Sequence, residues 1–164
     1  MKVINIQHPH HFKQSDFEQM VLALGFFDGV HLGHQKVINT AVETAKEKGL
    51  KCGVMTFFPH PSVVLKRNVD EVKYITPLEE KIRIIGELNV DYLFVVEFSE
   101  TFADLLPQEF VDDYIIGLNA VHVVAGFDYT YGKMGKGTME TLTFHSRNFF
   151  DYTVVPKLTN GTEK

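Results

Sequence analysis

Short apolar segments that alternate with amphipathic segments constrain the fold of this chain more than any other feature. Residues 21–25 are apolar on both faces, as strands of a buried parallel sheet are, and residues 121–125 form a further, mostly apolar segment. Residues 35–48 carry apolar side chains at helical spacing, and Gly49 follows as a suitable C-terminal stop. Strands that alternate with helices pair in parallel through βαβ crossovers. The sequence therefore predicts an α/β fold, a Rossmann-like, doubly wound and mostly parallel sheet, in one domain over residues 1–164.

The remaining elements follow from the same patterns. Thr76-Pro77-Leu78-Glu79 has the pattern of a capping box with proline at the first helical position, which predicts a helix to about Leu88. Residues 101–118 should be helical in one or two pieces around Pro107, and a small strand-and-loop excursion is expected within residues 126–156. Further strands are expected at residues 3–6, 52–58, 92–96 and 152–155.

Composition excludes several classes of protein. The formal charge is -5 and Lys and Arg do not cluster, which argues against a nucleic-acid binder. No apolar run approaches the ~20 residues that cross a bilayer, and the N-terminal segment turns polar too early for a secretory signal. Cys52 is the single cysteine, so an internal disulfide is excluded and a reducing, cytoplasmic location is expected.

Three segments with chemically active residues follow predicted strands. They are residues 25–34, 57–61 and 126–132. In a doubly wound sheet, ligands bind beyond the carboxyl ends of the strands. We therefore expect these segments to converge on one ligand site.

Two histidines stand at a predicted strand-to-helix turn. His31 and His34 are three residues apart, so they lie on one face of an incipient helix, and Gly33 between them lets a ligand approach the backbone. The N–H groups and the dipole of a helix N-terminus attract anions, and a nearby anion favours the imidazolium form. The turn therefore predicts a phosphate site, although histidines that only pack against their neighbours remain the alternative.

A zinc site is a further alternative for these histidines. It would need a third and a fourth ligand. His8, His10 and His11 offer nitrogen atoms, but at no suitable fixed spacing. We therefore assign no metal ligands.

The string GFFDGVHLGHQ at residues 25–35 is far more specific than the two histidines alone. It resembles the HxGH signature of the nucleotidyltransferase superfamily. More closely, it resembles the FMN adenylyltransferase domain of bacterial FAD synthetases, the bifunctional riboflavin kinase/FMN adenylyltransferases. The resemblance covers nearly the whole chain, through TFFPHP at 56–61, ITP at 75–77, EK at 80–81, FADL at 102–105, FV at 110–111 and GFDYTYG at 126–132.

The resemblance implies that the phosphate of FMN attacks the α-phosphorus of ATP, giving FAD and pyrophosphate. Such a step depends on positioning and charge stabilisation, and His31 and His34 are implied as the catalytic groups that stabilise charge on the triphosphate. Mg²⁺ is implied as a cation that bridges phosphates and keeps several waters. The ATP-binding residues implied are Gly25, Phe26, Phe27, Asp28, Gly29, His31, Gly33 and His34.

The flavin side is implied at two segments. From the residues alone, 59–61 is a rigid turn, and the aromatics of 126–132 are core or hairpin pairs. The resemblance favours instead an apolar slot for the isoalloxazine ring, with Asp128 as a polar anchor. The FMN-binding residues expected are Phe58, Pro59, His60, Pro61, Phe127, Asp128 and Tyr131.

Several charged residues receive no role in the chemistry. Lys133 and Lys136 are interpreted as solvated charges. Glu79, Glu80 and Lys81 are interpreted as part of the face and cap of their helix. The adjacent pair at 112–113 diverges on a helix, so it does not form a catalytic carboxylate pair.

The sequence differs from the family pattern in two places. Phe26 stands where family members often carry Asn, so the backbone contacts there are retained and the side-chain contact is not. The family pattern continues into a Ser/Thr-rich motif with an arginine and then a riboflavin kinase domain, whereas this sequence stops at residue 164. We therefore expect an isolated or truncated adenylyltransferase domain of a longer parent chain, with impaired turnover.

Two alternative functions remain open at this point. One is a flavin- or nucleotide-binding module with weak turnover or none. The other is a sibling HxGH enzyme that transfers a nucleotidyl group to another phosphate acceptor, such as a pyridine nucleotide or pantetheine phosphate. In each case the partners are small molecules, with neither nucleic acid nor a membrane.

Overall fold

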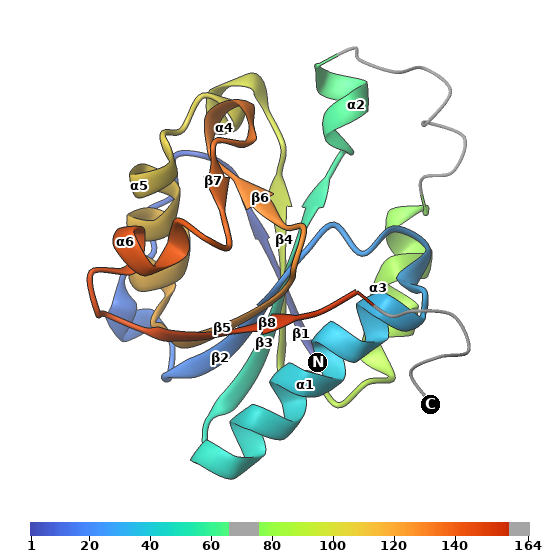
Figure 1. Cartoon of the computed structure of the whole chain (residues 1–164). Coiled ribbons are helices and arrows are strands. Elements are labelled where there is room, and N and C mark those ends of the chain that lie inside the picture. Colours follow the sequence, from blue (N-terminus) through green and yellow to red (C-terminus); the bar gives the residue numbers. More distant parts are fainter. Residues whose placement is uncertain (66–75, 158–164) are drawn as a thin grey trace.

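A six-stranded parallel sheet forms the centre of the computed structural model, which describes residues 1–65 and 76–157 (Figure 1). The strand order is β1-β4-β3-β2-β5-β8. This arrangement confirms the predicted α/β fold, and each predicted strand lies within a residue of its expected bounds. The strands are β1 (Lys2–Ile6), β2 (Met20–Leu24), β3 (Lys51–Phe58), β4 (Tyr92–Glu97), β5 (Ala120–Gly126) and β8 (Asp151–Val155).

The direction of winding reverses at β2. This strand pairs in parallel with β3 on one side and with β5 on the other, so Leu24 lies opposite both Met55 and Ala125. From β2 the chain proceeds outward through β3 and β4, and then returns to build β5 and β8 on the opposite side. Such a reversal leaves a crevice at the carboxyl ends of the two central strands. The segments that follow β2 and β5 meet there.

The sheet lies between two hydrophobic cores. Every residue of β2 is buried, and alternate side chains enter opposite cores, with Leu22 on one side and Val21 on the other. One face is covered by α1 (Leu32–Lys48) and α3 (Leu78–Gly86) (Figure 1). The other face is covered by α4 (Glu100–Ala103), α5 (Pro107–Phe110), η4 (Val111–Ile115), η5 (Ile116–Leu118) and α6 (Leu142–Ser146).

Two helix predictions need correction. The segment predicted as one or two helices over residues 101–118 is divided into α4, α5, the π-helical η4 and the 3₁₀ turn η5. The predicted capping box at Thr76 is wrong: Pro77 is the N-cap of α3, and no side chain caps the helix there. The Thr76 hydroxyl instead accepts a hydrogen bond from the Gly29 N–H. The local sequence predicts that the Thr76 side chain caps α3, but in the structure this side chain bonds to a residue distant in sequence instead.

The excursion after β5 is a short hairpin followed by α6. It contains β6 (Thr130–Tyr131), the 3₁₀ turn η6 (Lys133–Gly135) and β7 (Gly137–Thr138), and β6 and β7 are antiparallel. Gly132 has φ +80°, and a Cβ there would lie 2.8 Å from the Pro107 backbone nitrogen. Only glycine fits this position, so the hairpin packs directly on the start of α5.

Three short elements complete the described part of the chain: η1 (Gln14–Asp16), η2 (Asp28–Val30) and α2 (Pro61–Val64). Within the two described ranges, none of the helices is both long and apolar enough to cross a bilayer.

Candidate active site

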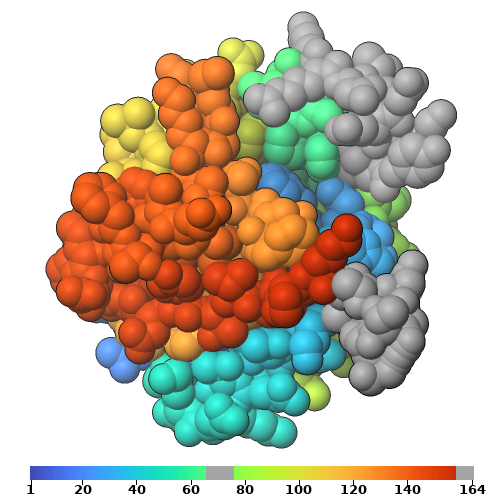
Figure 2. All heavy atoms as spheres, viewed as in Figure 1, coloured from blue at the N-terminus to red at the C-terminus, as the bar shows by residue number. Residues whose placement is uncertain are grey.

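A cleft of about 960 Å³ opens at the switch point of the sheet. The turn after β2, the N-terminus of α1 and the segment after β5 form its walls, and Figure 2 shows these segments side by side on one face of the molecule. Its lining includes Gly25, Phe26, Phe27, Asp28, His31, Leu32, Gly33, His34, Phe127, Asp128 and Lys157. Two of the three segments predicted to converge, 25–34 and 126–132, meet at this cleft, whereas no residue of 57–61 lines it.

His31 and His34 lie in this cleft as a stacked pair. Their ring centroids are 3.5 Å apart and their planes differ by 26°. His31 is the N-cap of α1 rather than a helical residue, and its Nδ1 accepts a hydrogen bond from the Gly33 N–H at 3.1 Å. A Cβ at residue 33 would lie 3.0 Å from His31 Cε1. Glycine is therefore what allows the His31 ring to fold back over the first turn of the helix.

The His34 ring has a low proton affinity. Burial, and secondly the adjacent His31 ring, lower the pKa of His34 from 6.5 to about 4, although Asp28 and Asp128 oppose this shift. In the part of the chain that the structure describes, His34 Nδ1 is buried and has no hydrogen-bond partner. His34 is therefore neutral near pH 7.

A second pocket, of about 420 Å³, adjoins the cleft. The end of β3, the start of α2, the helical segments after β4 and the β6–β7 hairpin surround it. Phe26, Tyr129 and Thr130 line both hollows and form their common wall. The other aromatic rings that line the pocket are Phe57, His60, Phe98, Phe102, Phe110 and Tyr131.

The residues expected on the nucleotide side are brought together, with one exception. Gly29 does not line the cleft, because its N–H group donates to Thr76. The other expected residues all line the cleft: Gly25, Phe26, Phe27, Asp28, His31, Gly33 and His34.

The residues expected on the flavin side divide between the two hollows. His60, Pro61 and Tyr131 line the second pocket, but Phe127 and Asp128 line the cleft that holds the histidines. Phe58 and Pro59 line neither, and Phe57 occupies the pocket wall instead. Successive side chains of β3 point to opposite faces, so the residue one position earlier in the strand reaches the pocket.

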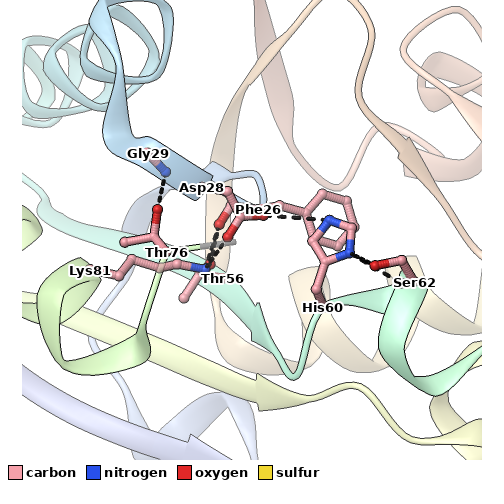
Figure 3. A network of polar contacts seen from close by, with 8 residues as sticks. All are labelled: Phe26, Asp28, Gly29, Thr56, His60, Ser62, Thr76 and Lys81. Atoms are coloured by element: carbon pink, nitrogen blue, oxygen red, sulfur yellow. Dashed lines mark hydrogen bonds and ion pairs between the residues drawn. The ribbon is translucent and has the colours of Figure 1, made fainter. Parts of the chain in front are cut away.

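Sequence analysis missed the main polar contact beneath the common wall. Lys81 is 2% exposed, and its ammonium group lies 3.3 Å from Asp28 Oδ1 (Figure 3). The interpretation of Lys81 as only part of the face and cap of its helix is therefore wrong. A signal was present, because Lys81 lies three residues after Leu78 and four before Ile85, on the apolar face of α3.

The alternative histidine cluster near the N-terminus serves packing. His8 Nδ1 lies 2.8 Å from the Tyr114 hydroxyl, and His10 Nε2 lies 2.8 Å from the Asp113 carbonyl oxygen. Among residues 1–65 and 76–157, no three His, Cys, Asp or Glu side chains are grouped to hold a metal ion. Ile75 of the ITP stretch and residues 158–164 lie outside the described residues.

Known proteins resemble this chain over its whole length. Residues 13–164 match the family model described as FAD synthetase. The chain is 55% identical over 164 residues to a bifunctional riboflavin kinase/FMN adenylyltransferase of Bacillus subtilis (strain 168), and 49% identical to one of Listeria monocytogenes. It covers 52% of each of these relatives, so it spans about half the length of the curated relatives that it matches.

A solved structure supports the same grouping. A protein of Streptococcus pneumoniae, described as a macrolide-efflux protein, has a TM-score of 0.82 and 33% identity. The alignment covers 98% of this chain and 53% of that protein. Together with the match to the family model over residues 13–164, the six-stranded nucleotidyltransferase-like sheet and the histidine pair at its switch point identify this chain as a member of the FAD synthetase family.

Proposed function

We propose that this chain transfers AMP from ATP to the phosphate of FMN. An oxygen of the FMN phosphate attacks the α-phosphorus of ATP, the bond from that phosphorus to the bridging oxygen breaks, and pyrophosphate leaves. The observation that carries the proposal is the pair of adjoining hollows that share Phe26, Tyr129 and Thr130. One hollow has an anion-binding helix terminus, and the other has aromatic walls.

The cleft supplies the charge stabilisation that this transfer needs. The triphosphate lies against the N-terminus of α1, where free N–H groups and the helix dipole favour anions. His31 and His34 donate hydrogen bonds to phosphate oxygens, and protonation of His34 balances part of the developing charge. Phe127 and Asp128 belong to this nucleotide side in our proposal, because they line the same cleft.

The second pocket suits a flat aromatic ligand. Rings of Phe57, His60 and Phe102 surround a volume of about 420 Å³, within the range of small-molecule sites. An isoalloxazine ring in this pocket would direct the ribityl phosphate past the shared wall toward the histidines. His60 and Pro61 stand at that boundary, at the N-terminus of α2.

Magnesium enters this proposal with the nucleotide. The described residues offer carboxylates singly, at Asp28 and Asp128, and not as a metal-binding group. This donor set fits Mg²⁺, which prefers phosphate oxygens and retained waters over an all-protein cage. When bound, the cation would neutralise phosphate charge.

Incubation of the protein with ATP, Mg²⁺ and FMN tests the proposal. We expect FAD and pyrophosphate in equal amounts, separated by chromatography. With nicotinamide mononucleotide or pantetheine phosphate as the acceptor, we expect no product. Saturable FMN binding with no FAD formed would identify a binding module, and turnover only with another acceptor would identify a sibling transferase.

Asp128 provides a test of how the two hollows are assigned. Asp128→Ala should change the Kd of ATP by about 3- to 10-fold and leave the Kd of FMN nearly constant, because Asp128 lines only the nucleotide cleft. Titration calorimetry with each ligand alone measures both constants. A larger change in the Kd of FMN than in the Kd of ATP would show that Asp128 belongs to the flavin site, as the sequence analysis predicts.

Protonation of His34 should accompany nucleotide binding. The pKa of His34 is depressed to about 4 without a ligand, and triphosphate charge raises the pKa of a neighbouring imidazole. Between about pH 5 and 7 the protein should therefore take up protons as ATP binds. Binding enthalpies in buffers of different ionisation enthalpy measure this uptake, and His34→Ala should abolish most of it. Equal uptake by the wild-type protein and the variant would remove His34 as the proton acceptor.

The same depressed pKa sets the sign of the pH dependence of folding. A histidine with a folded pKa below its unfolded value stabilises the fold above pH 6.5, and this contribution is lost as the pH falls toward 4. His34→Ala should therefore show a flatter decline of Tm over that window than the wild-type protein.

A further inference from the structure

We infer that Lys81 is a positioning residue for adenylyl transfer: its buried ammonium group fixes the turn between the two hollows and so sets where the two substrates meet. The inference rests on the proposed function and adds to it a residue outside the GFFDGVHLGHQ string. It is carried by the polar network of Phe26, Asp28, Thr56 and Lys81 (Figure 3).

The ammonium group of Lys81 has three polar neighbours. It donates to the Phe26 carbonyl oxygen at 2.8 Å and to Thr56 Oγ1 at 3.2 Å, and it lies 3.3 Å from Asp28 Oδ1. Two of the N–H donors of this ammonium group are thus in hydrogen bonds, and Asp28 is its ion-pair partner. Thr56 adds a further bond, because its hydroxyl donates to the same Phe26 carbonyl oxygen at 2.8 Å.

The position of Lys81 indicates that it acts through other residues. Its side chain is buried and lines neither hollow, so its ammonium group does not face the space where a phosphate would bind. Two of its partners, in contrast, line the hollows: Phe26 stands in the wall between them, and Asp28 lines the cleft. Lys81 therefore controls where these two residues stand without contacting substrate.

Asp28 extends the network toward the flavin pocket. Its Oδ2 lies 3.5 Å from His60 Nε2, and His60 lines that pocket. His60 Nδ1 accepts a hydrogen bond from the Ser62 backbone N–H, so in the neutral ring the proton is on Nε2 and faces Asp28. A continuous chain of polar contacts thus runs from Lys81 through Asp28 to His60.

A second contact joins α3 to the same turn. The Gly29 N–H donates to the Thr76 hydroxyl, just before α3 begins. The turn over residues 26–29 is thus held at both ends, by Lys81 at Phe26 and Asp28 and by Thr76 at Gly29. Because a displacement of about 1 Å can cost on the order of 10²-fold in rate, this attachment matters for a reaction between two bound substrates.

Four forms of the chain test the inference: wild type, Lys81→Met, the double variant Asp28→Asn/Lys81→Met, and Arg83→Met. Arg83→Met removes a cation from the same helix at an exposed position paired only with Glu80 and Glu87 in the described structure, so it is the matched control. The double variant removes both charges of the buried pair, since a single unpaired buried charge is strongly destabilising. Each form is assayed for Tm, for kcat per folded molecule and for the Kd of ATP, FMN and FAD.

FAD is the informative ligand, because it spans both hollows. We expect Lys81→Met to lower kcat roughly 10²-fold and to raise the Kd of FAD about 10-fold. The Kd values of ATP and of FMN, each measured alone, should stay within about 3-fold of those of the wild-type protein. The double variant should recover Tm relative to Lys81→Met and should not recover kcat. Arg83→Met should match the wild-type protein.

Three results overturn the inference. They are a wild-type kcat in folded Lys81→Met, recovery of kcat together with Tm in the double variant, and a parallel loss of affinity for all three ligands. Failure of the proposed function has a different signature, because the wild-type protein itself would then form no FAD.

Discussion

Replacing His31 or His34 by alanine should lower kcat roughly 10²–10³-fold, the usual effect of removing one donor to a transition state. Both side chains lie at the N-terminus of α1, where the triphosphate is proposed to bind. Charge on the phosphates and the leaving pyrophosphate grows during the transfer, so the loss should appear in kcat more than in the KM of ATP. Initial rates of FAD formation at saturating FMN separate the two constants.

The stacking of the two rings also predicts how the double variant His31→Ala/His34→Ala should behave. The rings are stacked 3.5 Å apart and His31 lowers the pKa of His34, so we expect the two histidines to act as a unit. His31→Ala/His34→Ala should therefore lose much less than the product of the two single effects. His11→Ala, at an exposed histidine far from the cleft in sequence, is the control and should keep the wild-type rate. Wild-type turnover in both single variants would exclude the histidines from the chemistry.

Filling the second pocket should weaken FMN binding strongly and leave ATP binding in the nucleotide cleft nearly unchanged. Ala103 lies at the end of α4 and lines only this pocket. The indole of Ala103→Trp would occupy space that the flavin needs, and overpacking of this kind costs about 1–3 kcal/mol. We expect the Kd of FMN to rise roughly 100-fold, equivalent to about 2.7 kcal/mol, while the Kd of ATP stays within about 3-fold.

Leu106→Trp is the matched control for this prediction. It adds a similar side chain at an exposed position three residues along the chain, outside both hollows. Flavin fluorescence titrations and nucleotide calorimetry on both variants make the comparison. If Ala103→Trp binds FMN as the wild-type protein does, the flavin lies elsewhere.

The framework of the site could be predicted from the sequence because its signals are local. Buried parallel strands show as short apolar runs such as residues 21–25, and α1 shows as a periodic segment that ends at Gly49. A turn between such elements falls at the carboxyl end of a strand by topology alone. These local signals place His31 and His34 at the carboxyl edge of the sheet, and both residues line the cleft there.

The second pocket could not be predicted in the same way, because its walls come from distant parts of the chain. Phe57, Phe102 and Tyr131 meet only after the sheet has formed and the hairpin has folded back on α5. Asp128 and Tyr131 are close in sequence yet line different hollows, since the hairpin carries Tyr131 away from the cleft.

Lys81 illustrates a different difficulty. A lysine among charged neighbours on a helix is usually solvated, and burial of its ammonium group is unfavourable without partners. Here burial lowers the pKa of Lys81, while Asp28, 53 positions earlier, offsets part of that effect. The helical period places Lys81 on the apolar face of α3, but only the folded structure shows that the Asp28 carboxylate lies beside it.

The central claim is that the nucleotide and the flavin occupy adjoining hollows so that their phosphates meet beside His31 and His34. A crystal structure of this chain with FMN and a non-reacting α,β-methylene analogue of ATP tests it most directly. Our account predicts the triphosphate against the N-terminus of α1, the isoalloxazine ring between Phe57 and Tyr131, and the FMN phosphate facing the α-phosphorus. Triphosphate density away from residues 25–34, or a flavin ring outside the second pocket, would contradict it.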